Sequence, residues 1–206
     1  GGYSDYALIP SFKYLAKLDG VDPDAATSLA CSGLTAYTAI KKANQNSPEF
    51  LVIVGAGVLG LMGVQIAKAI TNAKIICADL DDEKLNTAKE MGADFVINSK
   101  DPQSAEKIMS ICNDKGADSV VDFVNNPPTA KLDFPILRKR GNLVLAGLFG
   151  GSFELSLVTI PLKSITIQGA YTGNYADMVE LLALARKGIL NPIITKRYAL
   201  TDANTA

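Results

Sequence analysis

Apolar residues gather in short blocks, rather than alternating singly with polar ones, from residue 50 to about residue 170. Each block is rich in β-branched residues and is followed by a segment whose apolar positions recur with the period of a helix. Strands with both faces buried have such continuous apolar runs, which are typical of parallel sheets covered by helices. The pattern predicts strands at 50–54, 74–78, 94–97, 118–123, 142–146 and 164–168.

The segments between these strands predict helices, with one more helix after the last strand. Their expected ranges are 57–71, 81–91, 102–113, 128–139 and 174–187. Pro135 lies inside the fourth helix and is expected to break or kink it. Because crossovers between parallel strands are right-handed, short strand–helix steps leave few topologies. We therefore expect an α/β fold with a doubly wound, parallel, six-stranded Rossmann sheet.

The two ends of the chain do not follow this rhythm. Residues 5–18 predict two short extended pieces around a turn. Asp22-Pro23-Asp24 predicts the start of a helix, because proline suits the first helical position and acidic residues suit its positive end. This helix is expected to reach about Ala43, with a break at Gly33, and the tail after Asn191 contains one further extended run. The ends are therefore interpreted as flanking remnants of a second domain.

Composition limits the chemistry that this chain can supply. The 206 residues include no histidine, so the chain cannot provide a Ser/His/Asp triad, a Cys–His pair or a histidine metal ligand. The net charge is −1, and the charged residues are scattered, which argues against nucleic-acid binding. The longest run without a polar side chain, Phe50 to Val64, is shorter than the roughly 20 residues that a bilayer requires, so no membrane span is expected.

The three cysteines, Cys31, Cys77 and Cys112, are far apart and show no CxxC spacing. An odd, dispersed set argues against a disulfide framework and against a zinc ribbon. Unpaired cysteines are typical of reducing compartments, so we predict a cytoplasmic protein.

The most specific local motif is a glycine loop that follows the first predicted strand. Gly55, Gly57 and Gly60 form GxGxxG between Val52–Val54 and a helix. In this motif the first glycine permits a tight turn, the second lets a pyrophosphate approach the backbone, and the third lets helix and strand pack closely. The amides of the helix N-terminus then face the anion. Asp79 ends the second strand, where a carboxylate can bind ribose hydroxyls and repel a 2′-phosphate, which favours NAD over NADP.

Three simpler interpretations remain open for these residues. The glycines could form only a turn. Asp79 could be only the N-cap of the helix that begins near Asp81. A methyltransferase fold also uses a glycine loop and a later acid, but it usually has an acidic residue just before the glycines, where this chain has Val52–Val54.

Three further segments carry a resemblance to a known family. They are Gly2-Tyr3-Ser4-Asp5-Tyr6, Leu29-Ala30-Cys31-Ser32-Gly33-Leu34-Thr35-Ala36-Tyr37 and Gly169-Ala170-Tyr171-Thr172-Gly173-Asn174. Together they resemble the zinc-containing alcohol dehydrogenases of the medium-chain dehydrogenase/reductase superfamily, along essentially the whole chain. The resemblance implies an NAD-dependent oxidoreductase that transfers hydride between an alcohol and NAD. It also implies a GroES-like catalytic domain that this NAD-binding domain interrupts, and a small alcohol or carbonyl substrate.

The resemblance implies that Cys31 is the third ligand of a catalytic zinc in the intact enzyme. The other ligands, including a histidine, would lie before Gly1. We therefore expect no zinc in this chain, because such a site needs three protein ligands, and no catalytic residue in this fragment. The alternative for Cys31 is a buried, inert side chain.

The same resemblance implies a set of cofactor contacts. Thr35 and the Leu59 side chain would pack on the nicotinamide, and the amides of Val58 and Leu59 would face the pyrophosphate. Lys84 would reach the adenosine ribose beside Asp79, although it could equally be a solvated helix lysine. Further contacts, largely through the backbone, are expected at Val124, Ala146, Ala170 and Thr172.

The same family resemblance also implies a domain organisation and an oligomeric state. Residues 1–32 would be a remnant of the catalytic domain with its linking helix, 33–172 the NAD-binding Rossmann domain, and 173–206 the helix and strand that return to the catalytic domain. The apolar run Leu155–Ala170 ends at the last strand, which in relatives pairs with its twin. Because an unpaired edge invites association, we expect a homodimer or homotetramer through this strand.

Two rival functions stay open. A zinc-free quinone or enone reductase of the same superfamily would usually lack a cysteine at position 31 and would prefer NADPH, so Cys31 and Asp79 count against it. A non-catalytic dinucleotide-binding module would have no missing half, and the terminal segments outside the sheet count against it.

Overall fold

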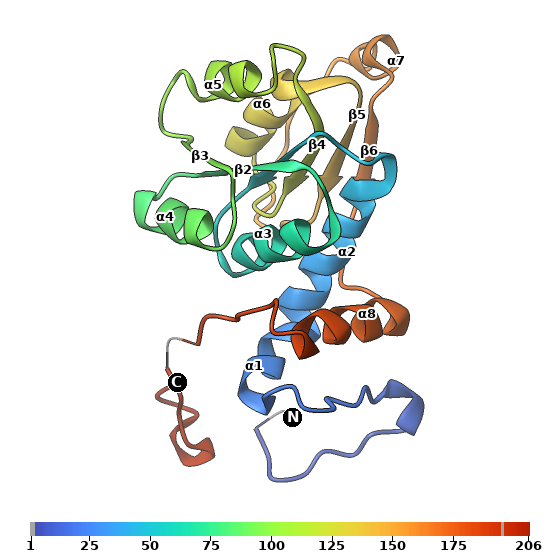
Figure 1. The fold of residues 1–206 in the computed structure, drawn as a ribbon, viewed down its shortest axis with the longest axis vertical. Helices are drawn as coiled ribbons and strands as arrows, with labels where there is room; N and C mark the ends of the chain where they lie inside the picture. Colours follow the sequence, from blue (N-terminus) through green and yellow to red (C-terminus); the bar gives the residue numbers. More distant parts are fainter. Residues whose placement is uncertain (1–2, 195) are drawn as a thin grey trace.

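The computed structural model describes residues 3–194 and 196–206, and it contains a six-stranded parallel sheet (Figure 1). Its strands are β1 Phe50–Val54, β2 Lys74–Asp79, β3 Phe95–Asn98, β4 Ala117–Asp122, β5 Leu137–Leu145 and β6 Thr166–Gly169. The strand order is β3-β2-β1-β4-β5-β6, and every neighbouring pair is parallel. This confirms the predicted doubly wound α/β Rossmann sheet.

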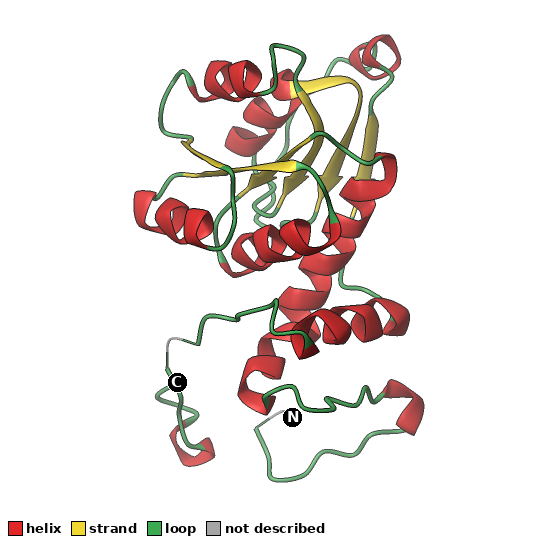
Figure 2. Cartoon of the chain, viewed as in Figure 1, coloured by secondary structure: helices red, strands yellow, loops and turns green. Residues whose placement is uncertain are grey.

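Helices cover both faces of the sheet, as Figure 2 shows. They are α1 Pro23–Ser28, α2 Leu34–Ala43, α3 Val58–Ile70, α4 Asp82–Glu90, α5 Ser104–Ile111, α6 Pro127–Ile136, α7 Thr159–Lys163 and α8 Tyr175–Arg186. In β1, Leu51 and Ile53 pack with residues of α2 and α3, whereas Val52 and Val54 pack with residues of α5 and α6. The strand lacks apolar–polar alternation because both of its faces lie in the core.

The N-terminal helices form one continuous column, so the predicted break at Gly33 is wrong. Asp22 caps α1 by accepting a hydrogen bond from the Ala25 amide at 3.2 Å. The chain then passes through a π-helical turn, Leu29–Gly33, directly into α2. A Cβ atom on Gly33 would lie 3.1 Å from Leu29 Cδ2 and 3.3 Å from Leu181 Cδ2. The glycine therefore serves the close packing of this turn on α8 rather than helix termination.

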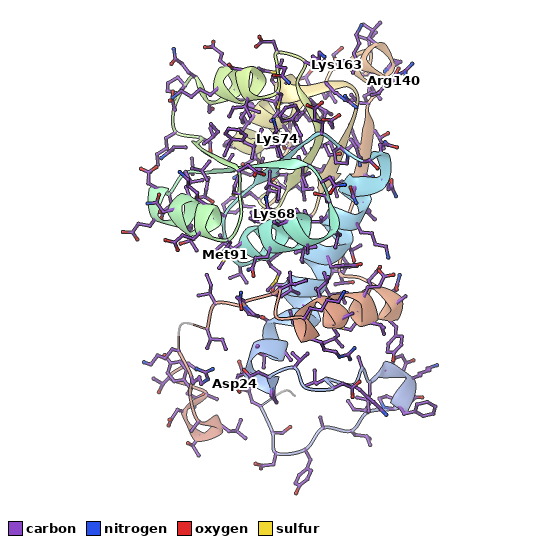
Figure 3. The ribbon with its side chains drawn as sticks, in the orientation of Figure 1. Asp24, Lys68, Lys74, Met91, Arg140 and Lys163 are labelled. Atoms are coloured by element: carbon purple, nitrogen blue, oxygen red, sulfur yellow. The ribbon has the colours of Figure 1, made fainter. Side chains whose placement is uncertain are left out.

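The predicted helix 128–139 ends earlier, at Ile136. Pro135 lies in its last turn, and β5 already begins at Leu137. The start of β5 was not predicted because three charged residues, 138–140, follow Leu137 and are half-buried or exposed, so the strand begins without an apolar run. Arg138 pairs with Asp118 of β4 at 2.6 Å, and Arg140 is exposed beside α7, near Lys163 (Figure 3).

The extended pieces predicted at the two ends are not strands. Residues 5–18 contain a 3₁₀ turn at Phe12–Tyr14 and no strand, and the described part of the tail contains only a 3₁₀ turn at Leu200–Asp202. Thr195 and the first two residues lie outside the described ranges. Helix α7 was not predicted. The described terminal segments, residues 3–20 and 196–206, lie away from the sheet (Figure 1). Among the described residues, no helix has the length and apolar character needed to cross a bilayer.

Candidate cofactor site

The glycine loop connects β1 to α3 at the carboxyl edge of the sheet. Gly55 has a φ of +94°, a conformation that favours glycine, and its amide donates to the Ala78 carbonyl at 2.8 Å. A Cβ atom on Gly60 would lie 1.7 Å from the Gly55 carbonyl oxygen. No side chain can occupy that position, so the start of α3 lies directly against the loop.

Gly57 borders open space instead. A Cβ atom built on it would meet nothing within 4 Å, and no side chain caps α3. The first-turn amides of a helix have no partner within the helix, and the helix dipole makes this end positive. Val58, the first residue of α3, is 65% exposed. The loop therefore presents an open cradle that suits an anionic group.

Asp79 joins this loop to the next one. One carboxylate oxygen accepts a hydrogen bond from the Ala56 amide at 2.6 Å, and the other accepts from the Asp81 amide at 3.0 Å. Asp81, not Asp79, is the N-cap of α4, where it accepts from the Glu83 amide at 2.9 Å. The interpretation of Asp79 as a helix cap is therefore wrong. Its carboxylate holds the glycine loop and the β2–α4 turn together.

A cleft of about 1140 Å³ opens beside Asp79, at the carboxyl ends of β1, β2 and β4. This is the switch point of the strand order, between β1 and β4, where doubly wound sheets bind their ligands. The cleft brings together four of the predicted site residues with segments that follow β3 and begin α6. The lining includes Gly55, Asp79, Lys84, Val124, Ser99, Lys100, Asp101, Asn126, Thr129 and Lys131.

The other predicted site residues lie outside the lining of this cleft. Ala146 and Ala170 are buried where β5 and β6 end; the Ala170 amide donates to the Leu145 carbonyl at 2.9 Å. Thr172 is exposed, with a φ of +50°. Thr35 is buried at the start of α2. The cleft lining also excludes four residues of the glycine loop and the start of α3: Gly57, Val58, Leu59 and Gly60.

Sequence reasoning missed Asp122, the last residue of β4, which organises this edge of the sheet. One of its carboxylate oxygens accepts from the amides of Val124 and Asn125 at 2.7 and 2.8 Å, and the other accepts from the Thr129 hydroxyl at 2.6 Å. Its carbonyl accepts from the Ala146 amide at 2.9 Å. The amides of two predicted contact residues, Val124 and Ala146, are therefore both held by hydrogen bonds to one buried aspartate. The sequence signal that could have identified Asp122 is an aspartate at the end of a predicted strand, directly before a turn.

The cysteines form no metal centre by themselves. Cys31 is exposed in the π-helical turn, and the described residues contain no group of three His, Cys, Asp or Glu side chains that could hold a metal. A catalytic zinc needs three protein ligands, so these residues do not fit a zinc ion alone. Cys77 and Cys112 are buried; burial raises the pKa of the Cys77 thiol to about 12 and that of Cys112 to about 11, which keeps both thiols neutral and inert.

The fold and this loop define a Rossmann-type domain, a class built to bind dinucleotides at the strand-order switch point. Residues 58–187 match the family model described as zinc-binding dehydrogenase. This match covers more than half of the chain, and the chain belongs to that family.

Curated and solved relatives agree with the family. An "NAD-dependent alcohol dehydrogenase" of Sulfurisphaera tokodaii is 39% identical over the whole chain, which spans 60% of that protein's length. The solved alcohol dehydrogenase of Aeropyrum pernix is 30% identical, with a TM-score of 0.79 over 88% of this chain and 52% of that one. The D-arabinose dehydrogenase of Sulfolobus solfataricus is 25% identical, with a TM-score of 0.85 over 94% and 60%.

Proposed function

We propose that this chain is the NAD-binding part of an alcohol dehydrogenase that transfers hydride between a small alcohol or carbonyl substrate and NAD. The observation that carries the proposal is the pairing of an open anion cradle at Gly57 with the Asp79 carboxylate on the neighbouring strand end. The relative from S. tokodaii is named for the same cofactor.

The two groups divide the cofactor between them. The amides of Val58 and Leu59, at the open start of α3, would face the pyrophosphate. Each Asp79 oxygen accepts one backbone amide and keeps a further lone pair for a ribose hydroxyl. A 2′-phosphate at this position would meet the charges of Asp79 and Asp81, so NAD is preferred to NADP. Lys84 lines the same cleft and would contact the ribose.

The nicotinamide half would lie beyond the cleft, along the carboxyl ends of β4 to β6. When bound, the nicotinamide ring accepts or donates the hydride. The residues of this chain would only orient it, through the groups described above: Thr35, Leu59, Val124, Ala146, Ala170 and Thr172.

The terminal segments are proposed as parts of a second domain. We assign residues 1–32 and 173–206 to the catalytic domain and its connections, and 33–172 to the cofactor domain. Large apolar side chains near the N-terminus lie open to solvent, including Tyr6 at 93% and Leu8 at 96% exposed. Cys31 would contribute one ligand to a zinc in the whole protein.

A homodimer or homotetramer is proposed through the edge of β6. Among the described strands, β6 pairs only with β5, so its outer edge has unpaired backbone groups. Apolar side chains of β6 and of the segment between β5 and β6 are exposed: Leu148, Phe149, Leu157, Val158, Leu162 and Ile167. An exposed apolar edge strand is a template for pairing with a second copy.

Calorimetric titration of the 206-residue chain with NAD and with NADP tests the cofactor proposal. We expect NAD to bind more tightly, and Asp79→Asn to weaken NAD about tenfold or more while narrowing the gap to NADP, because a charged hydrogen-bond acceptor is lost. Asp202→Asn, an exposed aspartate in the tail, is the matched control and should bind as the wild type does. Equal affinity of the wild type for the two cofactors would refute the assignment of Asp79.

A further inference from the structure

Two aspartates are buried where α6 packs on β4, next to the turn that lines the cleft. Asp122, at the end of β4, is 1% exposed, and Asp133, on α6, is 0% exposed. Asp122 accepts hydrogen bonds from two amides and from the Thr129 hydroxyl. Neither carboxylate oxygen of Asp133 has a hydrogen-bond partner in the described part of the chain. Asp133 follows Thr129 by one turn of α6, and the Thr129 hydroxyl contacts Asp122, so Asp133 lies on the helix face that is turned toward the Asp122 carboxylate.

Cations on and around α6 either have other partners or are exposed to solvent. On the elements packed against α6, Lys107 of α5 pairs with Asp101, and Arg138 of β5 pairs with Asp118 of β4. Lys163 of α7 donates to the carbonyls of Phe134 and Leu137, both at 3.2 Å, whereas Lys131 of α6 and Glu106 of α5 are exposed. None of these side chains forms a hydrogen bond with Asp133.

The chemistry of the pair decides where a proton must be. An ionised carboxylate can only accept hydrogen bonds, so two of them in contact cannot bond to each other. One proton converts the contact into a short, charge-assisted O–H···O⁻ bond. Asp122 already accepts three hydrogen bonds, whereas Asp133 accepts none, so the shared proton is assigned to Asp133. Burial, followed by the proximity of Asp122, raises the pKa of Asp133 well above its usual range.

We propose that Asp133 is a positioning residue that stays protonated in the folded protein and donates this proton to Asp122, thereby holding the turn 123–126 against α6. The turn contains Val124 and Asn126, which line the cleft. The same Asp122 holds the end of β5 through its carbonyl. Loss of the proton to solvent leaves two repelling carboxylates, which weakens the packing of Asp122 and its turn against this face of α6. The inference rests on the proposed function only for the identity of the ligand in this cleft.

The sign of the pH dependence follows from the raised pKa. Asp133 titrates near pH 4 when unfolded and at higher pH when folded, so folding takes up a proton between these two values. The stabilisation by the shared proton is complete below about pH 4 and is lost as the pH rises through the folded pKa. In this window the unfolding equilibrium constant should grow up to tenfold per pH unit from this residue alone.

Three variants and two measurements test the proposal without any cofactor. Urea unfolding at several pH values should show this slope in the wild type and in Glu106→Gln, an exposed control on α5. It should be missing in Asp133→Asn, whose amide can donate to Asp122 but cannot titrate. In NMR spectra, the Asp133 carboxyl carbon should have the shift of a protonated acid at pH 7.

Positioning is read from the amide resonances of Val124 and Asn125. Asp133→Ala, which lacks a donor, should shift both resonances, and Asp133→Asn should restore them to wild-type positions. An ionised Asp133 at pH 7, or an unchanged pH slope in Asp133→Asn, overturns the proposal. Equal amide shifts in the Asn and Ala variants also overturn it. Failure of NAD to bind would instead contradict the proposed function and leave these results intact.

Discussion

Alanine substitutions at two glycines of the same loop, Gly57 and Gly60, should distinguish an effect on NAD binding from an effect on stability. A Cβ atom on Gly60 would lie 1.7 Å from the Gly55 carbonyl oxygen, so Gly60→Ala must push α3 away from the loop backbone. Overpacking usually costs about 1–3 kcal/mol, and a clash with backbone belongs at or above the upper end, about 3 kcal/mol or more. A Cβ atom on Gly57 meets nothing within 4 Å, and its φ of −77° suits alanine. Gly57→Ala should therefore cost less than about 1 kcal/mol, the loss of a favoured N-cap residue.

For NAD affinity, measured per folded molecule, the order should be reversed: Gly57→Ala should weaken binding more than Gly60→Ala does. Gly57→Ala adds a methyl group where the pyrophosphate is proposed to approach, and we expect NAD affinity to fall at least tenfold in a protein of nearly wild-type stability. Urea unfolding gives the free energy of unfolding of both variants, and calorimetry gives the affinity. If Gly57→Ala binds NAD as tightly as the wild type, the cradle is not the pyrophosphate site. If Gly60→Ala unfolds at the wild-type urea concentration, the close packing of α3 on the loop is refuted.

Two further predictions concern the α2–α8 contact and the sheet edge. Asp177, 6% exposed, completes the capping box of α8 by accepting from the amide of the N-cap residue Asn174, and it pairs with Lys41 of α2 at 3.0 Å. Burial opposes its charge, but the Asn174 amide and Lys41 outweigh this and lower the pKa of Asp177. Asp177→Ala should cost about 1–2 kcal/mol at pH 7 in thermal or urea unfolding, a cost that disappears as the pH falls below about 4. At the edge, light scattering should show at least a dimer, and Ile167→Lys on β6 should weaken it, whereas Ile189→Lys, equally exposed at 38%, should not. A monomeric wild type, or equal effects of the two lysines, would contradict edge pairing.

The strand–helix repeat was readable from sequence because burial dictates it locally. Strands such as β1 and β2 need apolar residues on both faces because helices cover both, and this requirement produces an unbroken apolar run in the sequence. The glycine loop was readable for a similar reason. Gly55 and Gly60 are required by backbone conformation and by a close approach, both of which act within a few residues of chain.

Gly33 shows where a local signal misleads. A glycine at this position suggests a helix break, yet the helix continues through it, and the missing side chain allows close packing against Leu181 of α8. That partner is distant in sequence, so propensity alone could not identify it. Pro135 acts as its local signal indicates, because α6 ends one residue after it and β5 begins at Leu137.

The candidate site, like the fold, was predictable only where a local sequence pattern marks the residue. Asp79 could be found from its spacing after the glycine loop, but its hydrogen bond to the Ala56 amide, across 23 positions, could not. Asp122 and Asp133 carry no motif. Their importance arises only when β4, α6 and the turn between them are packed together.

By itself the sequence determined the class of fold, the order of its elements and the loop suited to a dinucleotide, because period, burial and glycine conformation are local properties. Only the tertiary structure decided which side chains meet: that Asp79 links two loops, that Asp122 holds the edge of the cleft, and that Asp133 is buried against another acid. Hydrogen bonds and pKa values depend on neighbours and on exclusion of water, and these exist only after the chain has folded.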